Sequence, residues 1–99
     1  MIDRRIIEQL AAEELVDANT KHDPKFNSPH EAYAVIKEEL EEMFDEAEYS
    51  VFYLGKLWEH VKADDDCTQQ LDLLKSRAVM VAQEAIQVVA MCDKAMKLY

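Results

Sequence analysis

The stretch that decides the fold is Lys37-Glu38-Glu39-Leu40-Glu41-Glu42-Met43, where apolar residues recur at helical spacing within a run of glutamates. Steps of three and four residues continue on both sides of it, which is typical of a long amphipathic helix. Gly55 is a position at which this helix could bend or end. The apolar stripe, which we expect to face a neighbouring helix, comprises Tyr33, Ile36, Leu40, Met43, Ala47, Val51, Leu54, Trp58 and Val61.

The start of this helix is marked by an unusually complete signal. Ser28 is suited to be the N-cap, Pro29 to be the first helical residue, and Glu31 to be the reciprocal partner of the cap. A helix over about residues 2–19 is predicted to precede it, and the segment 19–28 between them reads as a loop with Phe26 as its anchor.

A third helix is predicted after Asp64-Asp65-Asp66, since acidic residues are favoured at helix starts. It contains a second stretch of interest, Gln83-Glu84-Ala85-Ile86-Gln87-Val88. Its expected stripe repeats the three- and four-residue steps through Leu71, Leu74, Ala78, Val81, Ala85, Val88 and Cys92.

Composition agrees with an all-α protein. The chain has 99 residues, 49% of them hydrophobic, with one Gly and two Pro, so we predict a single domain over 1–99 built as an antiparallel bundle of three to four helices. The stripes carry more apolar surface than three helices can hide from water. We therefore expect oligomerisation, as a homodimer or homotetramer, to complete the bundle.

The net charge of −10 would repel phosphate backbones and anionic membranes, so neither nucleic acid nor membrane is an expected partner. Met1 is followed almost at once by Asp3, Arg4 and Arg5, so we expect no leader peptide. Two cysteines without zinc-site spacing fit a reducing, cytoplasmic location.

Two polar pairs stand at matching positions of the second and third helices. Glu39 with Glu42, and Glu84 with Gln87, are each three residues apart and so project from one side of a helix. When both stripes are written as heptads with Leu40 and Ala85 aligned, the pairs fall on the same flank. Antiparallel packing would bring these flanks together in an oxygen-lined pocket. The alternative is that both pairs are ordinary solvated rim positions.

The motif Ser28-Pro29-His30-Glu31-Ala32-Tyr33, followed by Ile36 and Glu38-Glu39-x-x-Glu42, resembles the MazG-like nucleoside triphosphate pyrophosphohydrolases of the all-α pyrophosphatase superfamily. The later stretch Glu84-Ala85-Ile86-Gln87-Val88-Val89-Ala90-Met91 is similar to the small, phage-type branch. The resemblance covers about residues 26–95 and implies Mg²⁺-dependent hydrolysis of a nucleoside triphosphate to the monophosphate and pyrophosphate.

The resemblance also implies roles for residues. Glu39, Glu42 and Glu84 would be metal ligands, Gln87 would take the fourth ligand position, and Glu38 would orient or deprotonate the attacking water. Carboxylate oxygens suit Mg²⁺, and Mn²⁺ could replace it. Gln87 stands where the family has Asp, so we expect weaker metal binding.

Phosphate-binding candidates, which are basic residues expected near the pocket, are Lys37, Lys56 and Arg77. Tyr33 and Trp58 could stack on a base, but their place on the stripe favours a core position. The 41 residues between Glu42 and Glu84 exceed the family's usual spacing, which predicts an extended helix pair. The competing function is a helical nucleotide-binding or interaction protein that keeps the fold without efficient catalysis.

Overall fold

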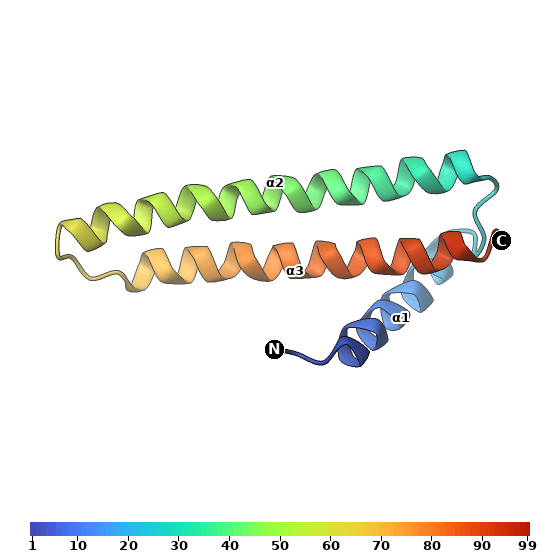
Figure 1. Ribbon diagram of the computed structural model, residues 1–99, viewed down its shortest axis with the longest axis horizontal. Coiled ribbons are helices and arrows are strands. Elements are labelled where there is room, and N and C mark those ends of the chain that lie inside the picture. Colours follow the sequence, from blue (N-terminus) through green and yellow to red (C-terminus); the bar gives the residue numbers. More distant parts are fainter.

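A computed structural model describes residues 1–99 as three helices, with 82% of the chain helical and no strands. The helices are α1 (Arg4–Lys21), α2 (Pro29–Lys62) and α3 (Thr68–Met96). Figure 1 shows α2 and α3 as a long antiparallel hairpin, with α1 crossing the end of the hairpin that holds the chain's C-terminus. The backbone of α1 approaches α3 and not α2. The predicted all-α fold is confirmed.

The start of α2 is capped as predicted, with one difference. Ser28 Oγ accepts a hydrogen bond from the Glu31 backbone N–H at 3.1 Å, and Pro29 is the first helical residue. The Glu31 side chain accepts from Asn27 Nδ2 at 2.9 Å instead of from the Ser28 backbone. From there α2 runs without a break for 34 residues, through Gly55, where an added Cβ would meet nothing within 4 Å.

The turn between α2 and α3 is formed by the backbone of Asp64 and Asp65 and by the side chain of Asp66. Asp64 has φ 57°, the left-handed conformation that follows many helix ends. The N–H of Asp65 donates to the His60 carbonyl at 3.0 Å, and that of Asp64 to the Val61 carbonyl at 3.1 Å. Asp66 Oδ1 then accepts from the Thr68 N–H at 2.9 Å and so begins α3.

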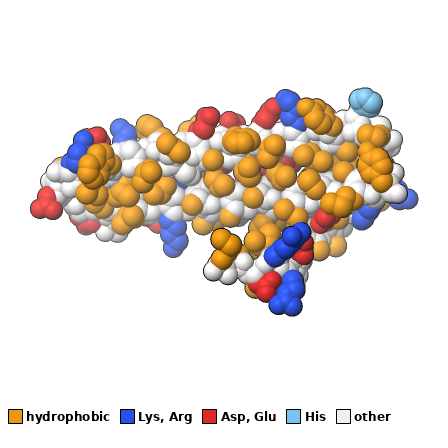
Figure 2. Space-filling view, in the orientation of Figure 1, with side chains coloured by type: hydrophobic (Ala, Val, Ile, Leu, Met, Phe, Trp, Pro, Cys, Tyr) orange, Lys and Arg blue, Asp and Glu red, His pale blue; other side chains and the backbone are white.

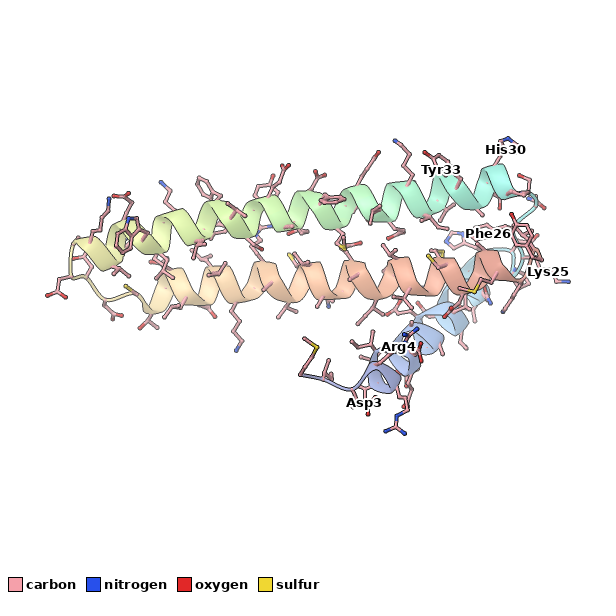
Figure 3. All side chains as sticks on the ribbon, viewed as in Figure 1. Asp3, Arg4, Lys25, Phe26, His30 and Tyr33 are labelled. Atoms are coloured by element: carbon pink, nitrogen blue, oxygen red, sulfur yellow. The ribbon has the colours of Figure 1, made fainter.

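The core lies at the end of the hairpin that α1 crosses. Phe26 is 7% exposed there, as the sequence predicted, and Figure 3 shows it where the loop meets the ends of α2 and α3. Small residues allow the helices to approach closely. The buried hydrophobic cluster consists of Ala11, Leu15, Phe26, Ala32, Ala90 and Met91.

The contact face of α2 differs from the predicted stripe. Ile36, Met43 and Ala47 are half-buried as expected, whereas Tyr33 and Trp58, which were predicted to belong to the core, are exposed in the single chain. Their exposed fractions are 68% and 58%, and Figure 3 shows Tyr33 on the side of α2 away from α3. Further exposed members of the two stripes include Val51, Leu54, Val61 and Leu71.

Polar residues take several of the inner positions instead, and two of them, Glu46 and Ser50, are hydrogen-bonded there. Arg77 Nη1 of α3 donates to Glu46 Oε2 of α2 at 3.1 Å, with both side chains largely shielded. Ser50 Oγ donates to the Glu46 carbonyl at 3.1 Å. The inner face of α2 thus follows a heptad-like path through Ile36, Glu39, Met43, Glu46, Ser50, Tyr53 and Leu57.

None of the three helices is both long enough and apolar enough to cross a membrane.

Candidate metal centre

The carboxylates of Glu39, Glu42 and Glu84 converge between α2 and α3. One oxygen from each lies within 4.8 Å of the other two. Glu39 and Glu42 are neighbours because they stand one turn apart on α2, and Glu84 reaches them from the antiparallel α3. Glu39 and Glu84 are half-buried and Glu42 is exposed. The predicted convergence of the two motifs is therefore found for these three carboxylates, and Gln87 lines the same cavity as Glu39.

The position of these side chains relative to the helix contact differs from the prediction. Glu39 and Glu84 were expected beside the apolar seam, on its flank. Both instead lie on the inner face itself, since Glu39 is one heptad from Glu46, which pairs with α3. The same orientation of α2 leaves Leu54 and Trp58 exposed.

Burial and the nearby negative charges raise the pKa values of two of the three carboxyl groups. Loss of solvent, followed by repulsion from Glu42 and Glu84, raises the pKa of Glu39 to about 6. Loss of solvent, followed by the charge of Glu84, also raises the pKa of Glu42. Three anionic groups at this separation repel one another unless a proton or a cation is shared among them. Hard oxygen donors with unbalanced charge are a donor set that fits a divalent cation such as Mg²⁺.

Gln87, the fourth predicted ligand, faces α1. Its Nε2 donates to Glu14 Oε2 at 2.9 Å, and both side chains are half-buried. Glu14 has no signal in the sequence, because its contact with Gln87 exists only where α1 crosses α3. The role of Gln87 in metal binding stays a prediction.

Glu38, predicted to act on the attacking water, is exposed and one residue from the cluster. It lines, together with Glu39, a cavity between the helices. Its charge contributes to raising the pKa of Glu39, which places it within electrostatic reach of the cluster.

The three predicted phosphate ligands are engaged with other groups. Lys37 pairs with Glu41 on the surface of α2. Lys56 Nζ lies 5.3 Å from the centroid of the Phe52 ring. Arg77, besides binding Glu46, stacks 4.7 Å from the Tyr49 ring centroid. None of these contacts involves a residue of the carboxylate cluster.

Lys94 is a further buried cation that sequence analysis missed. It is 5% exposed and stands one turn after Met91 on α3. The sequence signal for its burial was its position one helical turn after the apolar residues Ala90 and Met91.

No protein-family model matches the chain, and neither a curated protein nor a solved structure is significantly similar to it. The resemblance to the MazG-like enzymes thus rests on the motifs themselves.

Proposed function

We propose that this protein is a Mg²⁺-dependent nucleoside triphosphate pyrophosphohydrolase. The observation that carries the proposal is the convergence of three carboxylates. One oxygen of Glu39, Glu42 and Glu84 each lies within 4.8 Å of the others, although Glu84 comes from another helix and is far from the first two in sequence. Burial, followed by repulsion from Glu42 and Glu84, raises the pKa of Glu39, and a cation at this cluster would offset that repulsion. The EExxE-type motif and the later stretch from Glu84 to Met91 supply the resemblance to the family, from which Gln87 departs.

In the proposed reaction, water attacks a phosphoryl group of the triphosphate, and the products are the nucleoside monophosphate and pyrophosphate. Mg²⁺, when bound, shields the phosphate charge and acts as a Lewis acid. Glu39, Glu42 and Glu84 hold the cation in this scheme, and Mn²⁺ can take its place. Glu38 orients the attacking water and accepts its proton.

Metal binding can be tested apart from catalysis by titrating the purified protein with Mn²⁺ and following the loss of free-ion signal by electron paramagnetic resonance. We expect Glu39→Gln and Glu84→Gln each to weaken binding about tenfold or more, since each removes a charged ligand. Glu41→Gln is the matched control, because Glu41 is exposed and pairs with Lys37. Equal binding by all four proteins would refute the ligand assignment.

Activity is tested by incubating the protein with canonical and modified nucleoside triphosphates, with Mg²⁺ or Mn²⁺, and assaying pyrophosphate. Metal-dependent release is expected, and both Glu39→Gln and Glu84→Gln should abolish it while retaining the helical circular dichroism. Absence of release across the panel would contradict the enzyme proposal.

A second function is favoured by two contacts. Gln87 is hydrogen-bonded to Glu14, and Arg77, a predicted phosphate ligand, is hydrogen-bonded to Glu46. A chain with three carboxylate ligands and no basic side chain committed to phosphate would be a nucleotide-binding or interaction protein without efficient catalysis. Nucleotide binding with no pyrophosphate release would support this alternative.

The proposal also includes assembly as a homodimer or homotetramer. Only 7 of 99 residues are buried, while large apolar side chains remain exposed along the hairpin. Figure 2 shows hydrophobic side chains spread over the face of α2 and α3 that is turned to the viewer. We define the outer apolar face by Val51, Leu54, Trp58 and Val61 of α2, each at least 49% exposed. A second copy that covers this face would complete a bundle.

A further inference from the structure

A cavity of about 420 Å³ lies next to the carboxylate cluster, between the end of α1, the loop that follows it, and the hairpin. This volume is within the range of roughly 300–1,000 Å³ that small-molecule sites occupy. Phe26, Val35 and Met91 form its apolar wall, and Glu38 and Glu39 also line it. Because Glu39 belongs to both the cavity and the cluster, a molecule in the cavity can extend to the proposed metal.

Lys94 is the lysine of this cavity, and its ammonium group is held in an unusual way. Its Nζ donates to the Asp23 backbone carbonyl at 2.7 Å and lies 4.6 Å from the centroid of the Phe26 ring. No carboxylate of the chain forms an ion pair with it. A buried charge without a counter-ion is costly. An ammonium has three N–H donors, so this one retains capacity for a ligand acceptor.

The charge of the lining restricts which ligand fits. Apart from Lys94, the charged side chains around the cavity are mainly acidic: Asp23, Glu31, Glu38 and Glu39. Phosphate groups would be repelled from such a lining, whereas N–H groups and hydroxyls can donate to it. The single cation faces a wall formed by an aromatic ring and apolar side chains, which suits a flat heterocycle.

We propose that this cavity binds the nucleoside part of the nucleotide and that Lys94 donates a hydrogen bond to a ring carbonyl oxygen of the base. The inference rests on the proposed function, which places the triphosphate at the neighbouring carboxylates. Guanine, hypoxanthine, cytosine, uracil and thymine all carry a ring carbonyl, and adenine does not. Lys94 is thereby a specificity-determining residue that favours bases with a ring carbonyl over adenine.

The test measures nucleoside binding in the absence of metal, so that it does not depend on catalysis. Inosine and adenosine are the matched pair, because they differ at carbon 6 by a carbonyl in place of an amino group; uridine is the pyrimidine probe. Binding is followed by NMR of protein labelled at the methionine methyl groups. Met91 lines the cavity and should shift, while the exposed Met80 on the same helix should not.

We expect inosine or uridine to bind at least about tenfold more tightly than adenosine, as a hydrogen bond to a charged donor allows. Lys94→Met keeps the apolar stem and removes the donors, so the preference should fall to about one. Lys94→Arg should retain part of it. Lys75→Met, which removes an exposed charge from the same helix, should leave the preference unchanged.

Equal binding of inosine, uridine and adenosine would overturn the proposal, and so would binding that shifts Met80 instead of Met91. Absence of binding by all three would also overturn it. If Lys94 only held the loop, Lys94→Met would lower the unfolding temperature without changing the preference. If Lys94→Met does not fold, the inosine-to-adenosine ratio of the unaltered protein and of Lys94→Arg decides.

The two proposals can fail separately. Selective nucleoside binding without pyrophosphate release would support the cavity assignment and contradict the enzyme. Pyrophosphate release from all triphosphates at equal rates, with no selective nucleoside binding, would support the enzyme proposal and contradict the cavity assignment.

Discussion

Glu39 has the most perturbed carboxyl group of the cluster, and its protonation links the metal centre to stability. Its pKa is raised from 4.5 to about 6. Between these pH values the folded chain binds more protons at this position than the unfolded chain does. The free energy of unfolding therefore falls as the pH rises through this window. At about pH 6 half of the Glu39 carboxyls are charged, and the destabilisation is nearly complete about one pH unit above the pKa.

Replacing this carboxylate should stabilise the metal-free protein at neutral pH. We expect Glu39→Gln to raise the free energy of unfolding by about 1 kcal/mol at pH 7.5, after allowance for solvent screening, and to have little effect at pH 4.5. Urea unfolding in the presence of a chelator measures both values. Glu41→Gln serves as control, and equal stabilisation by Glu39→Gln at the two pH values would contradict the explanation.

Metal binding should show the opposite dependence on pH. Mg²⁺ needs the charged form of Glu39, so protons and metal compete for it. We expect affinity to fall as the pH is lowered through about 6, and calorimetric titrations at pH 5.5, 6.5 and 7.5 would measure this. An affinity that is constant over this range would show that Glu39 is not a ligand.

Some of the individual residues of the candidate site were predictable from the sequence. Helical spacing identified Glu39 with Glu42, and the heptad match brought Glu84 to them. The same match could not place Gln87, because its position depends on α1 and on Glu14. A side chain's partner across an unpredicted helix crossing has no signature in its own sequence neighbourhood.

At the level of elements, the turn between α2 and α3 offers a test of backbone conformation. Asp64 has φ 57°, which glycine adopts at lower cost than aspartate. We expect Asp64→Gly to raise the free energy of unfolding by about 0.5 kcal/mol and Asp64→Val to lower it by about 1 kcal/mol or more. Urea unfolding measures both.

Asp65→Gly is the matched control, since Asp65 does not have positive φ. It should be neutral or destabilising. Stabilisation by glycine at position 65 but not at position 64 would contradict the assigned turn.

Helix existence and capping were predictable because their causes are local. Ser28 and Pro29 determine where α2 begins, and the aspartates at 64–66 separate α2 from α3. The rotation of α2 about its axis was not predictable from hydrophobicity. Polar residues such as Glu46 can face another helix when a partner such as Arg77 satisfies them, whereas an apolar stripe can be left for solvent or for another chain.

For the whole molecule, the outer apolar face leads to a concentration-dependent prediction. Trp58 is the only tryptophan and is 58% exposed in the single chain. If a second copy covers this face, its fluorescence should shift to shorter wavelength as protein concentration rises, in parallel with dimerisation observed by sedimentation. Leu54→Glu should prevent both changes, because it places a charge in the apolar contact.

Lys56→Glu is the control on the same helix, since Lys56 is exposed and outside the defined apolar face. It should permit association. A stable monomer at all concentrations would contradict the oligomer proposal.

The uneven placement of the core divides the hairpin into regions of unequal local stability. The buried cluster reaches from Ala11 to Met91 but includes no residue between 33 and 89. Amide hydrogens near the α2–α3 turn should therefore exchange with solvent through local opening, while those around Ala32 and Ala90 should exchange only on global unfolding. Glu39 and Glu84 stand at the boundary between these regions. A cation that joins them would thus extend the cooperative unit into the open arm of the hairpin, and protection from exchange would report metal binding even without a substrate.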